Sequence, residues 1–319
     1  MSSRASLRVA AVQRATAFLD REAATGLALD AMTEAAGNGA QLIAFPETHI
    51  AGYPFWADIT NASHFNDADQ KAAWGQYLDS TVDVARGDLD PVVAAAADLG
   101  LFVYLGIAER SASGSSIYCS LVAIHPELGI VGVHRKLKPT YGERLMWADG
   151  DGHGLKVHET FGTRVSGLNC WENWMPLARA AMYAQGTQVH VSVWPGSPAL
   201  THDNSRLIAL EGRVFVVAAG GVLRQKHLSA DFPLREAMGQ VRDRYASGGA
   251  IIVAPDGTVL AAANKHEETI LYADLDLTMI GQERHNFDPS GHYSRADVLS
   301  LTVDRRRREP AVFIDDGGL

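Results

Sequence analysis

The 319-residue chain contains only two cysteines, has no long apolar run, and carries no excess of positive charge. Two cysteines far apart in the sequence do not suggest a disulfide framework. Without about 20 consecutive apolar residues, no membrane-spanning helix is expected. The net charge of −9 argues against nucleic acid or an anionic membrane as a partner. Since the N-terminus has no signal-like apolar region either, we expect a cytoplasmic protein.

Motifs for metals and nucleotide cofactors are also missing. The 12 histidines are scattered, with no His-x-x-x-His spacing, and no Cys-x-x-Cys pair accompanies them. The chain has neither a Gly-x-Gly-x-x-Gly run nor a P-loop. We therefore expect no metal and no cofactor.

The composition, with 47% hydrophobic and 20% charged residues, is that of a globular protein with a large core. Turn-like segments at 125–129 and 255–257 predict two antiparallel hairpins. Helices that alternate with strands, together with these hairpins, favour mixed sheets with helices outside. The expected strands are 7–13, 42–45, 102–108, 115–124, 130–134, 164–168, 189–193, 214–219, 250–253, 259–263 and 269–275, and the expected helices are 18–36, 90–100, 175–185 and 205–212.

No repeat or linker divides the sequence, so we expect a single domain over 1–319 with a short tail from about residue 300. Segment 223–246 is polar and irregular, which is typical of a surface excursion or a partner-contact loop. The four arginines at 305–308 indicate a solvated charge cluster in the tail.

Cys170 is the most informative residue, because it lies between a predicted strand and a predicted helix that has Pro176 near its first turn. A thiolate is favoured near the positive end of a helix. A single placed cysteine is a candidate nucleophile, although a small buried apolar role is the alternative. The other cysteine, Cys119, lies inside a predicted strand, and we expect it in the core.

Two further segments carry suitable charges at strand ends. Glu47 follows the strand at 42–45, and Lys136 lies in the basic run 134–140 after another strand. Each alone is weak evidence, since such residues are often solvated. A nucleophile needs a base and a positive group that holds the developing anion. Glu47, Lys136 and Cys170 supply these roles, and one edge of a sheet could bring them together.

Together these segments resemble the nitrilase superfamily, whose members share a Glu-Lys-Cys triad. The similarity runs from Leu7 to about Leu299, and Cys170-Trp171-Glu172 resembles the true nitrilases. Ala296, where that branch commonly has proline, and the short tail are departures, and the tail argues against long filaments. The segments that carry the resemblance are 45–47, 134–140, 143–144, 150–152, 170–172, 175–179, 209–213 and 290–295.

The resemblance implies an α-β-β-α sandwich and a homodimer or larger homo-oligomer. It implies that Cys170 attacks a nitrile carbon to form a thioimidate, with Glu47 as general base. Lys136 and the N–H that follows Cys170 stabilise the tetrahedral species. Glu143 would be a second carboxylate in the site that positions Lys136 or relays a proton, and a surface glutamate at a helix start is the alternative.

The expected reaction converts an organic nitrile to a carboxylic acid and ammonia. An amidase, a cyanide-degrading enzyme and an amide-releasing enzyme could use the same triad, and a non-catalytic scaffold is the alternative from another class. Aromatic walls suit apolar nitriles, although core packing is the alternative for these side chains. The candidate substrate-binding residues are Trp171, Tyr53, Asn173, Trp194 and His202.

Overall fold

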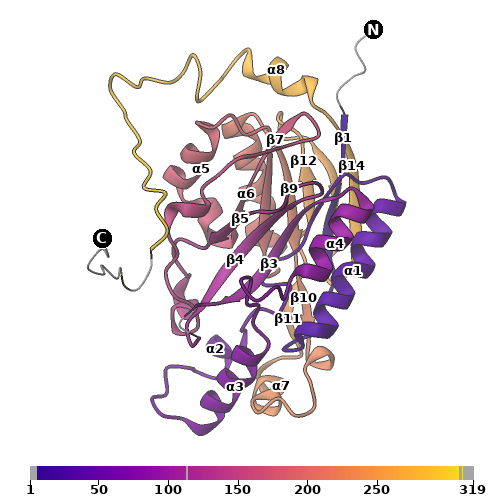
Figure 1. The fold of residues 1–319 in the computed structure, drawn as a ribbon, viewed down its shortest axis with the longest axis vertical. Coiled ribbons are helices and arrows are strands. Elements are labelled where there is room, and N and C mark those ends of the chain that lie inside the picture. Colours follow the sequence, from indigo (N-terminus) through magenta and orange to yellow (C-terminus); the bar gives the residue numbers. More distant parts are fainter. Residues whose placement is uncertain (1–5, 113, 309–310, 312–319) are drawn as a thin grey trace, which may run out of the picture.

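The computed structural model, which describes residues 6–112, 114–308 and 311, contains two six-stranded sheets (Figure 1). The first sheet has the strand order β14-β1-β2-β3-β4-β5, and the second has the order β13-β12-β9-β8-β7-β6. Their strands are β1 (Ser6–Gln13), β2 (Leu42–Ala44), β3 (Phe102–Arg110), β4 (Ile117–His125), β5 (Gly129–Arg135), β6 (His158–Thr160), β7 (Thr163–Asn169), β8 (Val189–Trp194), β9 (Phe215–Gly220), β12 (Ile251–Val253), β13 (Val259–Ala262) and β14 (Thr269–Asp276).

Helices cover the outer face of each sheet. In Figure 1, α1 and α4 lie outside the first sheet, and α5 and α6 lie outside the second. This α-β-β-α arrangement confirms the expected fold. The helices are α1 (Arg21–Gly37), α2 (Trp56–Ile59), α3 (Ala68–Asp79), α4 (Asp90–Leu99), α5 (Pro176–Tyr183), α6 (Pro198–Gly212), α7 (Arg235–Val241) and α8 (Thr278–Arg284), and the 3₁₀ helices are η1 (Tyr141–Leu145), η2 (Gly152–Gly154), η3 (Cys170–Trp174) and η4 (Gln225–His227).

Both sheets are mixed, as the sequence predicts. In the first sheet β1, β2 and β3 are parallel, and β14, β4 and β5 join them in antiparallel pairs. In the second sheet β7, β8 and β9 are parallel, while β6, β12 and β13 pair antiparallel. The predicted hairpins at 125–129 and 255–257 are therefore confirmed as β4–β5 and β12–β13.

Strand β1 shows how the layers are held together. Val9 and Ala11 pack into the core between the two sheets, whereas Ala10 and Val12 pack under α1. Burial of each valine contributes about 1.5–3 kcal/mol. Because successive side chains alternate between faces, a slip of one residue would exchange the two cores.

Two helix starts differ from the expected positions. Helix α1 begins at Arg21 and not at residue 18, because the Asp20 carboxylate caps it by accepting from the Ala23 N–H. Helix α6 begins at Pro198, seven residues before the expected start. Its early turns bury polar Thr201, so they lack the apolar periodicity that predicts a helix.

Segment 223–246 is ordered and not irregular. It contributes to a two-stranded sheet of β10 (Val222–Arg224) and β11 (Arg244–Ser247), and it contains α7. Phe232 and Met238 of this segment are buried in a cluster with Trp56 and Tyr77. These apolar residues are spaced too widely in the sequence for a periodic signal.

Within the described residues, no helix combines the length and apolarity needed to span a membrane. A cytoplasmic location and a single domain stay predictions. Residues 1–5, where no signal region was expected, and residues 309–310 and 312–319 of the expected tail lie outside the described part of the chain.

Candidate active site

Three predicted residues lie where strands end. Glu47 follows β2 by three residues, while Lys136 directly follows β5 and Cys170 directly follows β7. Strands β2 and β5 belong to one sheet, and β7 belongs to the other. The site therefore joins strand ends of two sheets, and the hypothesis of a single sheet edge is wrong.

The charged groups meet in a small buried cluster. Lys136 Nζ lies 2.9 Å from Glu47 Oε1 and 2.6 Å from Glu143 Oε2. A carboxylate oxygen from each glutamate and the Cys170 sulfur all lie within 4.8 Å of one another. Two carboxylates and a thiol could hold a metal ion, but the Lys136 ammonium already provides the positive charge between the two carboxylates.

Glu143 reaches the cluster from η1. Its Oε2 also accepts from the Thr140 N–H at 2.6 Å, and its Oε1 accepts from the Tyr53 hydroxyl at 2.8 Å. This carboxylate does begin a helix, as the alternative interpretation held, but it is buried and not at the surface.

The backbone around Glu47 passes tightly over Gly106 of β3. A Cβ at Gly106 would lie 2.2 Å from the Pro46 carbonyl oxygen, so any side chain would displace Glu47. Glu47 Oε1 accepts from Lys136 and, at 3.3 Å, from the Cys119 thiol. Glu47 Oε2 has no hydrogen-bond partner among the described residues, which leaves one oxygen of this buried carboxylate available for a proton.

Cys119 lies in the core, as expected, but its contacts with the site were missed. Besides the thiol contact with Glu47, its carbonyl oxygen accepts from the Lys136 N–H at 2.8 Å. The predicted hairpin brings β4 beside β5, but a β-bulge between Ala123 and Ile124 shifts their register by one residue. The turn alone therefore did not reveal that Cys119 faces Lys136.

The pKa values follow from burial and from charge. Burial raises the pKa of Glu47 from 4.5 to about 7; Lys136 opposes this shift and Glu143 adds to it. Burial also raises the pKa of the Cys170 thiol, and so does Glu47, whereas Lys136 and the Trp171 N–H lower it. Burial disfavours the charged form of Lys136, but its anionic neighbours raise its pKa above the ordinary value.

The expectation that a helix start stabilises a Cys170 thiolate is therefore wrong. Helix α5 begins only at Pro176, and Cys170 instead starts a short 3₁₀ turn with two carboxylates nearby. Cys170 has a φ of 48°, a left-handed conformation that is strained for a residue with a Cβ. The arrangement suits a neutral thiol that loses its proton to an adjacent base as it attacks.

Glu172 supports the site, although the sequence analysis named it only as part of the motif Cys170-Trp171-Glu172. This buried carboxylate accepts from the Leu137 N–H at 2.6 Å and from the Asn169 N–H at 3.0 Å. It also lies 3.0 Å from His134 Nε2. Glu172 thus joins the residue after Lys136 to the residue before Cys170. The spacing of Asn169 and Glu172, typical of a capping box, was the available signal.

Glu172→Gln is expected to lower kcat by about 10- to 100-fold, because one amide hydrogen would face a main-chain N–H and shift the two segments. We expect a smaller change in KM, measured by steady-state kinetics alongside thermal unfolding. Glu159→Gln, on an exposed position of β6, is the matched control. Wild-type kcat in Glu172→Gln would contradict this role.

A group of packed aromatic side chains lies next to the Lys136 ammonium. Tyr53 packs on Phe55 and Trp147, with ring centroids 4.5 and 5.4 Å apart respectively. The Trp147 ring lies 5.5 Å from Lys136 Nζ, close enough for a cation–π contact. Trp147 was not predicted, although it follows Glu143 by one helical turn.

The other candidate substrate-binding residues differ in how deeply they are buried. Trp194 is buried in one cluster with Cys170, and Trp171 is 45% exposed. Asn173 is buried and donates to the carbonyl oxygens of Leu168 and Cys170, so it supports the backbone around the sulfur. His202, on α6, is partly buried. Contact of these side chains with a substrate stays a prediction.

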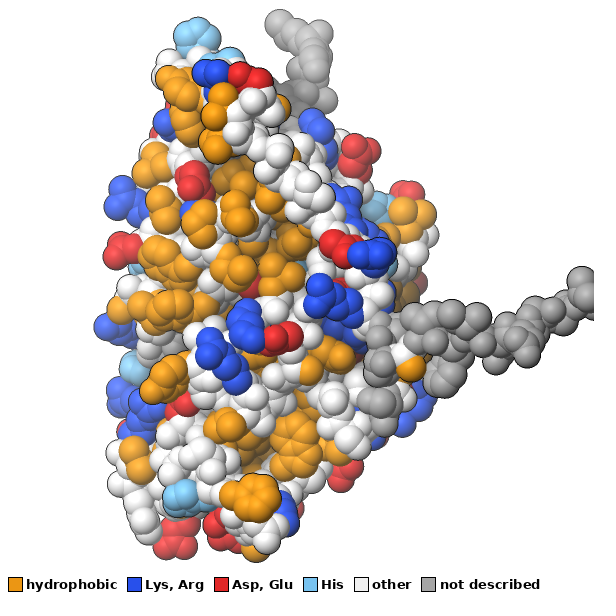
Figure 2. Space-filling view, turned by 90° about the vertical axis from the view of Figure 1, so that its left-hand side faces the viewer, with side chains coloured by type: hydrophobic (Ala, Val, Ile, Leu, Met, Phe, Trp, Pro, Cys, Tyr) orange, Lys and Arg blue, Asp and Glu red, His pale blue; other side chains and the backbone are white. Residues whose placement is uncertain are grey.

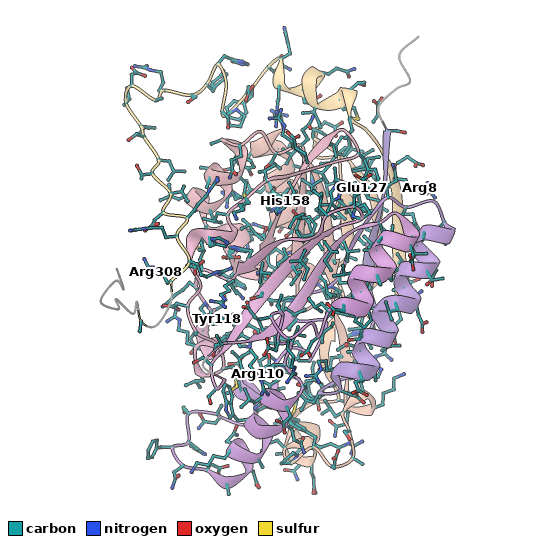
Figure 3. All side chains as sticks on the ribbon, viewed as in Figure 1. Arg8, Arg110, Tyr118, Glu127, His158 and Arg308 are labelled. Carbon is teal, nitrogen blue, oxygen red and sulfur yellow. The ribbon has the colours of Figure 1, made fainter. Side chains whose placement is uncertain are left out.

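A small cavity lies beside Glu47. Its volume is about 20 Å³, enough for roughly one water molecule, and Tyr53, Phe55 and Pro195 line it. A larger hollow of about 740 Å³ lies at the opposite end of the β4–β5 hairpin, near Glu127 (labelled in Figure 3). None of the residues that line this hollow belongs to the buried cluster.

Comparisons with known proteins agree on one family. The sequence model of the carbon-nitrogen hydrolase family matches residues 8–285. The chain is 37% identical to Nitrilase 2 of an unknown prokaryotic organism, over 96% of both chains. It is 34% identical to a bifunctional nitrilase/nitrile hydratase of Lupinus angustifolius, over 96% of this chain and 88% of the relative.

Solved structures support the fold. The chain resembles a carbon-nitrogen hydrolase from Helicobacter pylori with a TM-score of 0.70 and 18% identity, over 92% of this chain and 96% of that one. At this identity the likeness concerns the fold alone.

Proposed function

The chain belongs to the carbon–nitrogen hydrolase family and to its nitrilase branch, and from this premise we propose that it hydrolyses an organic nitrile to a carboxylic acid and ammonia through Cys170. The observation that carries the proposal is the buried cluster in which the Cys170 sulfur lies within 4.8 Å of two carboxylates. One of those carboxylates, Glu47, has a free oxygen, and Lys136 supplies a fixed positive charge between the two.

In the first step, Glu47 Oε2 takes the thiol proton as the Cys170 sulfur attacks the nitrile carbon. One C–N π bond breaks, a C–S bond forms, and the nitrogen receives the proton. Lys136 and the Trp171 N–H stabilise the developing negative charge on nitrogen. The product is a thioimidate on Cys170.

Water then attacks the thioimidate carbon, with Glu47 again as the base. The tetrahedral species that forms has two possible leaving groups. If protonated nitrogen leaves as ammonia, a thioester remains, and a second water releases the acid and restores the thiol. If the C–S bond breaks first, the amide is released after one water has been added. Glu143, by holding Lys136 and Tyr53, positions the charge that decides this balance.

Turnover should depend on pH through Glu47. A base acts when it is deprotonated, so kcat/KM should rise as the pH increases through about 7, the raised pKa of Glu47. Below that value it should fall by about tenfold per pH unit. Initial rates between pH 5.5 and 9.0 at constant ionic strength measure this limb. A limb near 4.5, the ordinary pKa of a glutamate, would contradict the burial argument.

The reaction is tested with purified protein on aliphatic nitriles, aromatic nitriles, arylacetonitriles, cyanide and the matching amides. Ammonia and acid are measured together, and the intact mass of acid-quenched protein is followed during turnover. Equal amounts of acid and ammonia, with a mass adduct on the peptide that contains Cys170, are the expected result. Turnover of amides alone would assign the protein to the amidases. No turnover, together with no alkylation of Cys170, would support a scaffold.

Cyanide is a second candidate substrate, because the cavity beside Glu47 holds only about 20 Å³. A cavity of that size favours a very small nitrile. The relative rates on cyanide and on the larger nitriles of the same panel distinguish the two candidates.

We also propose a homodimer or larger homo-oligomer, with a second copy packed on α5 and α6. Leu177, Leu207 and Leu210 of these helices are exposed. In Figure 2, hydrophobic side chains gather widely on the face that carries α5. Exposed apolar areas of this extent are typical of protein interfaces. Sedimentation velocity of the wild type and of Leu177→Lys tests this assembly.

A further inference from the structure

One arginine of the expected solvated cluster at 305–308 is only partly solvated: the Arg307 side chain is 22% exposed. Arg307 Nη1 lies 3.1 Å from Asp151 Oδ1, and Arg307 Nη2 donates to the Val133 carbonyl oxygen at 2.9 Å. The Asp151 side chain is only 4% exposed and also accepts from the Arg308 N–H. Arg306 does fit the expectation, since its side chain is 87% exposed and, among the described residues, pairs with nearby Asp304.

The segment 304–308 is the end of a long exposed stretch of chain that follows α8 and contains neither helix nor strand. In Figure 1 the yellow chain that follows α8 runs down the outside of the molecule, and Arg308 is labelled at its lower end in Figure 3. Residues 290–302 of this chain are exposed, and Val303 packs against the cluster that contains Leu155 and Met182. The Arg307 side chain therefore anchors a segment whose backbone also contacts the loop, through the Arg308 N–H and through the Arg305 carbonyl oxygen, which lies 3.2 Å from His153 Nδ1.

The loop 150–154 lies between this segment and the candidate lysine. The Gly150 N–H donates to the Lys136 carbonyl oxygen at 2.9 Å, and a Cβ at Gly150 would lie 2.2 Å from the Arg135 carbonyl oxygen. A Cβ at Gly152 would lie 2.1 Å from the Asp304 carbonyl oxygen. No side chain fits at either glycine, so the backbone of the outer segment lies directly against the loop, and the loop lies directly against the backbone of Lys136.

Burial alone would raise the pKa of Asp151, but hydrogen bonds from the N–H groups of Arg308 and His153 and the charges of Arg307 and Arg135 lower it. Asp151 is thus held as a carboxylate by the same segment. The ion pair links the C-terminal region to a loop that contacts the site from outside.

We propose that residues 304–308 form a clamp in which Arg307, through Asp151 and Val133, positions Lys136 between Glu47 and Glu143. Arg307 is a positioning residue, since it touches neither the cluster nor a substrate. Both of its contacts hold the chain next to Lys136: Val133 lies three residues before it, and the loop of Asp151 binds its carbonyl oxygen. This proposal rests on the proposed nitrile hydrolysis.

Loss of the clamp should weaken catalysis more than stability. Glu47 is faced by Lys136, by Glu143, by the two thiols of Cys119 and Cys170, and by the phenols of Tyr53 and Tyr77. Lys136 is the cation among these groups. If Lys136 moves away, the Glu47 carboxylate loses its stabilising charge. The acidic limb of kcat/KM should then shift to higher pH, a change that a purely structural role would not produce.

The test compares Arg307→Gln and Asp151→Asn with Arg306→Gln, the matched control from the same segment. We expect Arg307→Gln and Asp151→Asn each to lower kcat by about 10- to 100-fold, since small displacements in a site have effects of this size. KM should change less than about threefold, and the acidic limb should move upward. The double variant should lose little more than either single variant, because both remove one interaction. Arg307→Lys should recover part of the activity.

Activity of the wild type on nitriles tests the proposed function, and the variants test only the clamp. The failure of one proposal can therefore be distinguished from the failure of the other. Arg307→Gln with wild-type kcat and an unchanged pH limb would overturn the clamp. A lower thermal midpoint with an unchanged kcat per folded molecule would also overturn it, since the contact would then serve stability alone. Gly152→Ala, which should push the segment outward without removing a charge, is expected to reproduce the effects of Arg307→Gln.

Discussion

Lys136→Met is expected to reduce kcat/KM by at least about 10³-fold, because the cation that holds the developing charge is removed. It should also lower the free energy of unfolding by about 3–5 kcal/mol at pH 8, since two buried carboxylates would remain without their partner. Glu47 and Glu143 lie in one cluster within 4.8 Å, and both are buried. Their mutual repulsion is largest when both are ionised.

The sign of the pH dependence follows from this repulsion. At pH 5 one carboxyl can take up a proton, so the variant should be closer to the wild type in stability than at pH 8. Urea unfolding at both values, followed by tryptophan fluorescence, measures the difference. Lys138→Met is the matched control, since Lys138 is half exposed and pairs with Asp149 at the surface. If Lys136→Met lowered the free energy of unfolding, relative to the wild type, by the same amount at pH 5 and at pH 8, the buried-charge argument would be contradicted.

Cys170→Ala is expected to lower kcat by at least about 10⁴-fold, because no covalent intermediate can form without the sulfur. The mass adduct expected on the wild type should be absent from this variant. The fold should persist, since the change removes one buried sulfur atom, and equilibrium binding of a nitrile should remain measurable. The assay is a single-turnover experiment with quenched intact mass.

Cys119→Ala is the informative comparison for this variant. The Cys119 thiol is buried and donates to Glu47, so we expect kcat to fall by about fivefold, which corresponds to one hydrogen bond of about 1 kcal/mol. The mass adduct should remain. An adduct that survives in Cys170→Ala but disappears in Cys119→Ala would mean that the nucleophile has been assigned to the wrong cysteine.

Local patterns predicted much of this structure. The strand at 189–193 is a run of mostly β-branched residues, and the turn at 125–129 marks a hairpin, so both were found. Helix α6 was found only in its second half, because Thr201, Asn204 and Ser205 point into the core with polar side chains. Burial of polar groups hides the period on which helix prediction depends.

Contacts between distant segments could not be predicted in the same way. Glu47 and Lys136 are 89 residues apart, and Asp151 and Arg307 are 156 apart. Only the resemblance to a family predicted that Glu47 and Lys136 belong to one site. Nothing of that kind distinguished Arg307 from Arg306, because their different exposure depends only on where the folded segment crosses the loop 150–154.

The division of the cluster between two sheets has a consequence for the life of the protein in a cell. Glu47 and Lys136 leave one sheet and Cys170 leaves the other, so neither half of the sandwich holds a working set of residues. Activity should therefore disappear at the moment when the sheets separate, and the same event exposes the core between them. A molecule that loses its catalysis in this way exposes its apolar core at the same moment, and unfolded chains with exposed cores are what quality-control proteases degrade.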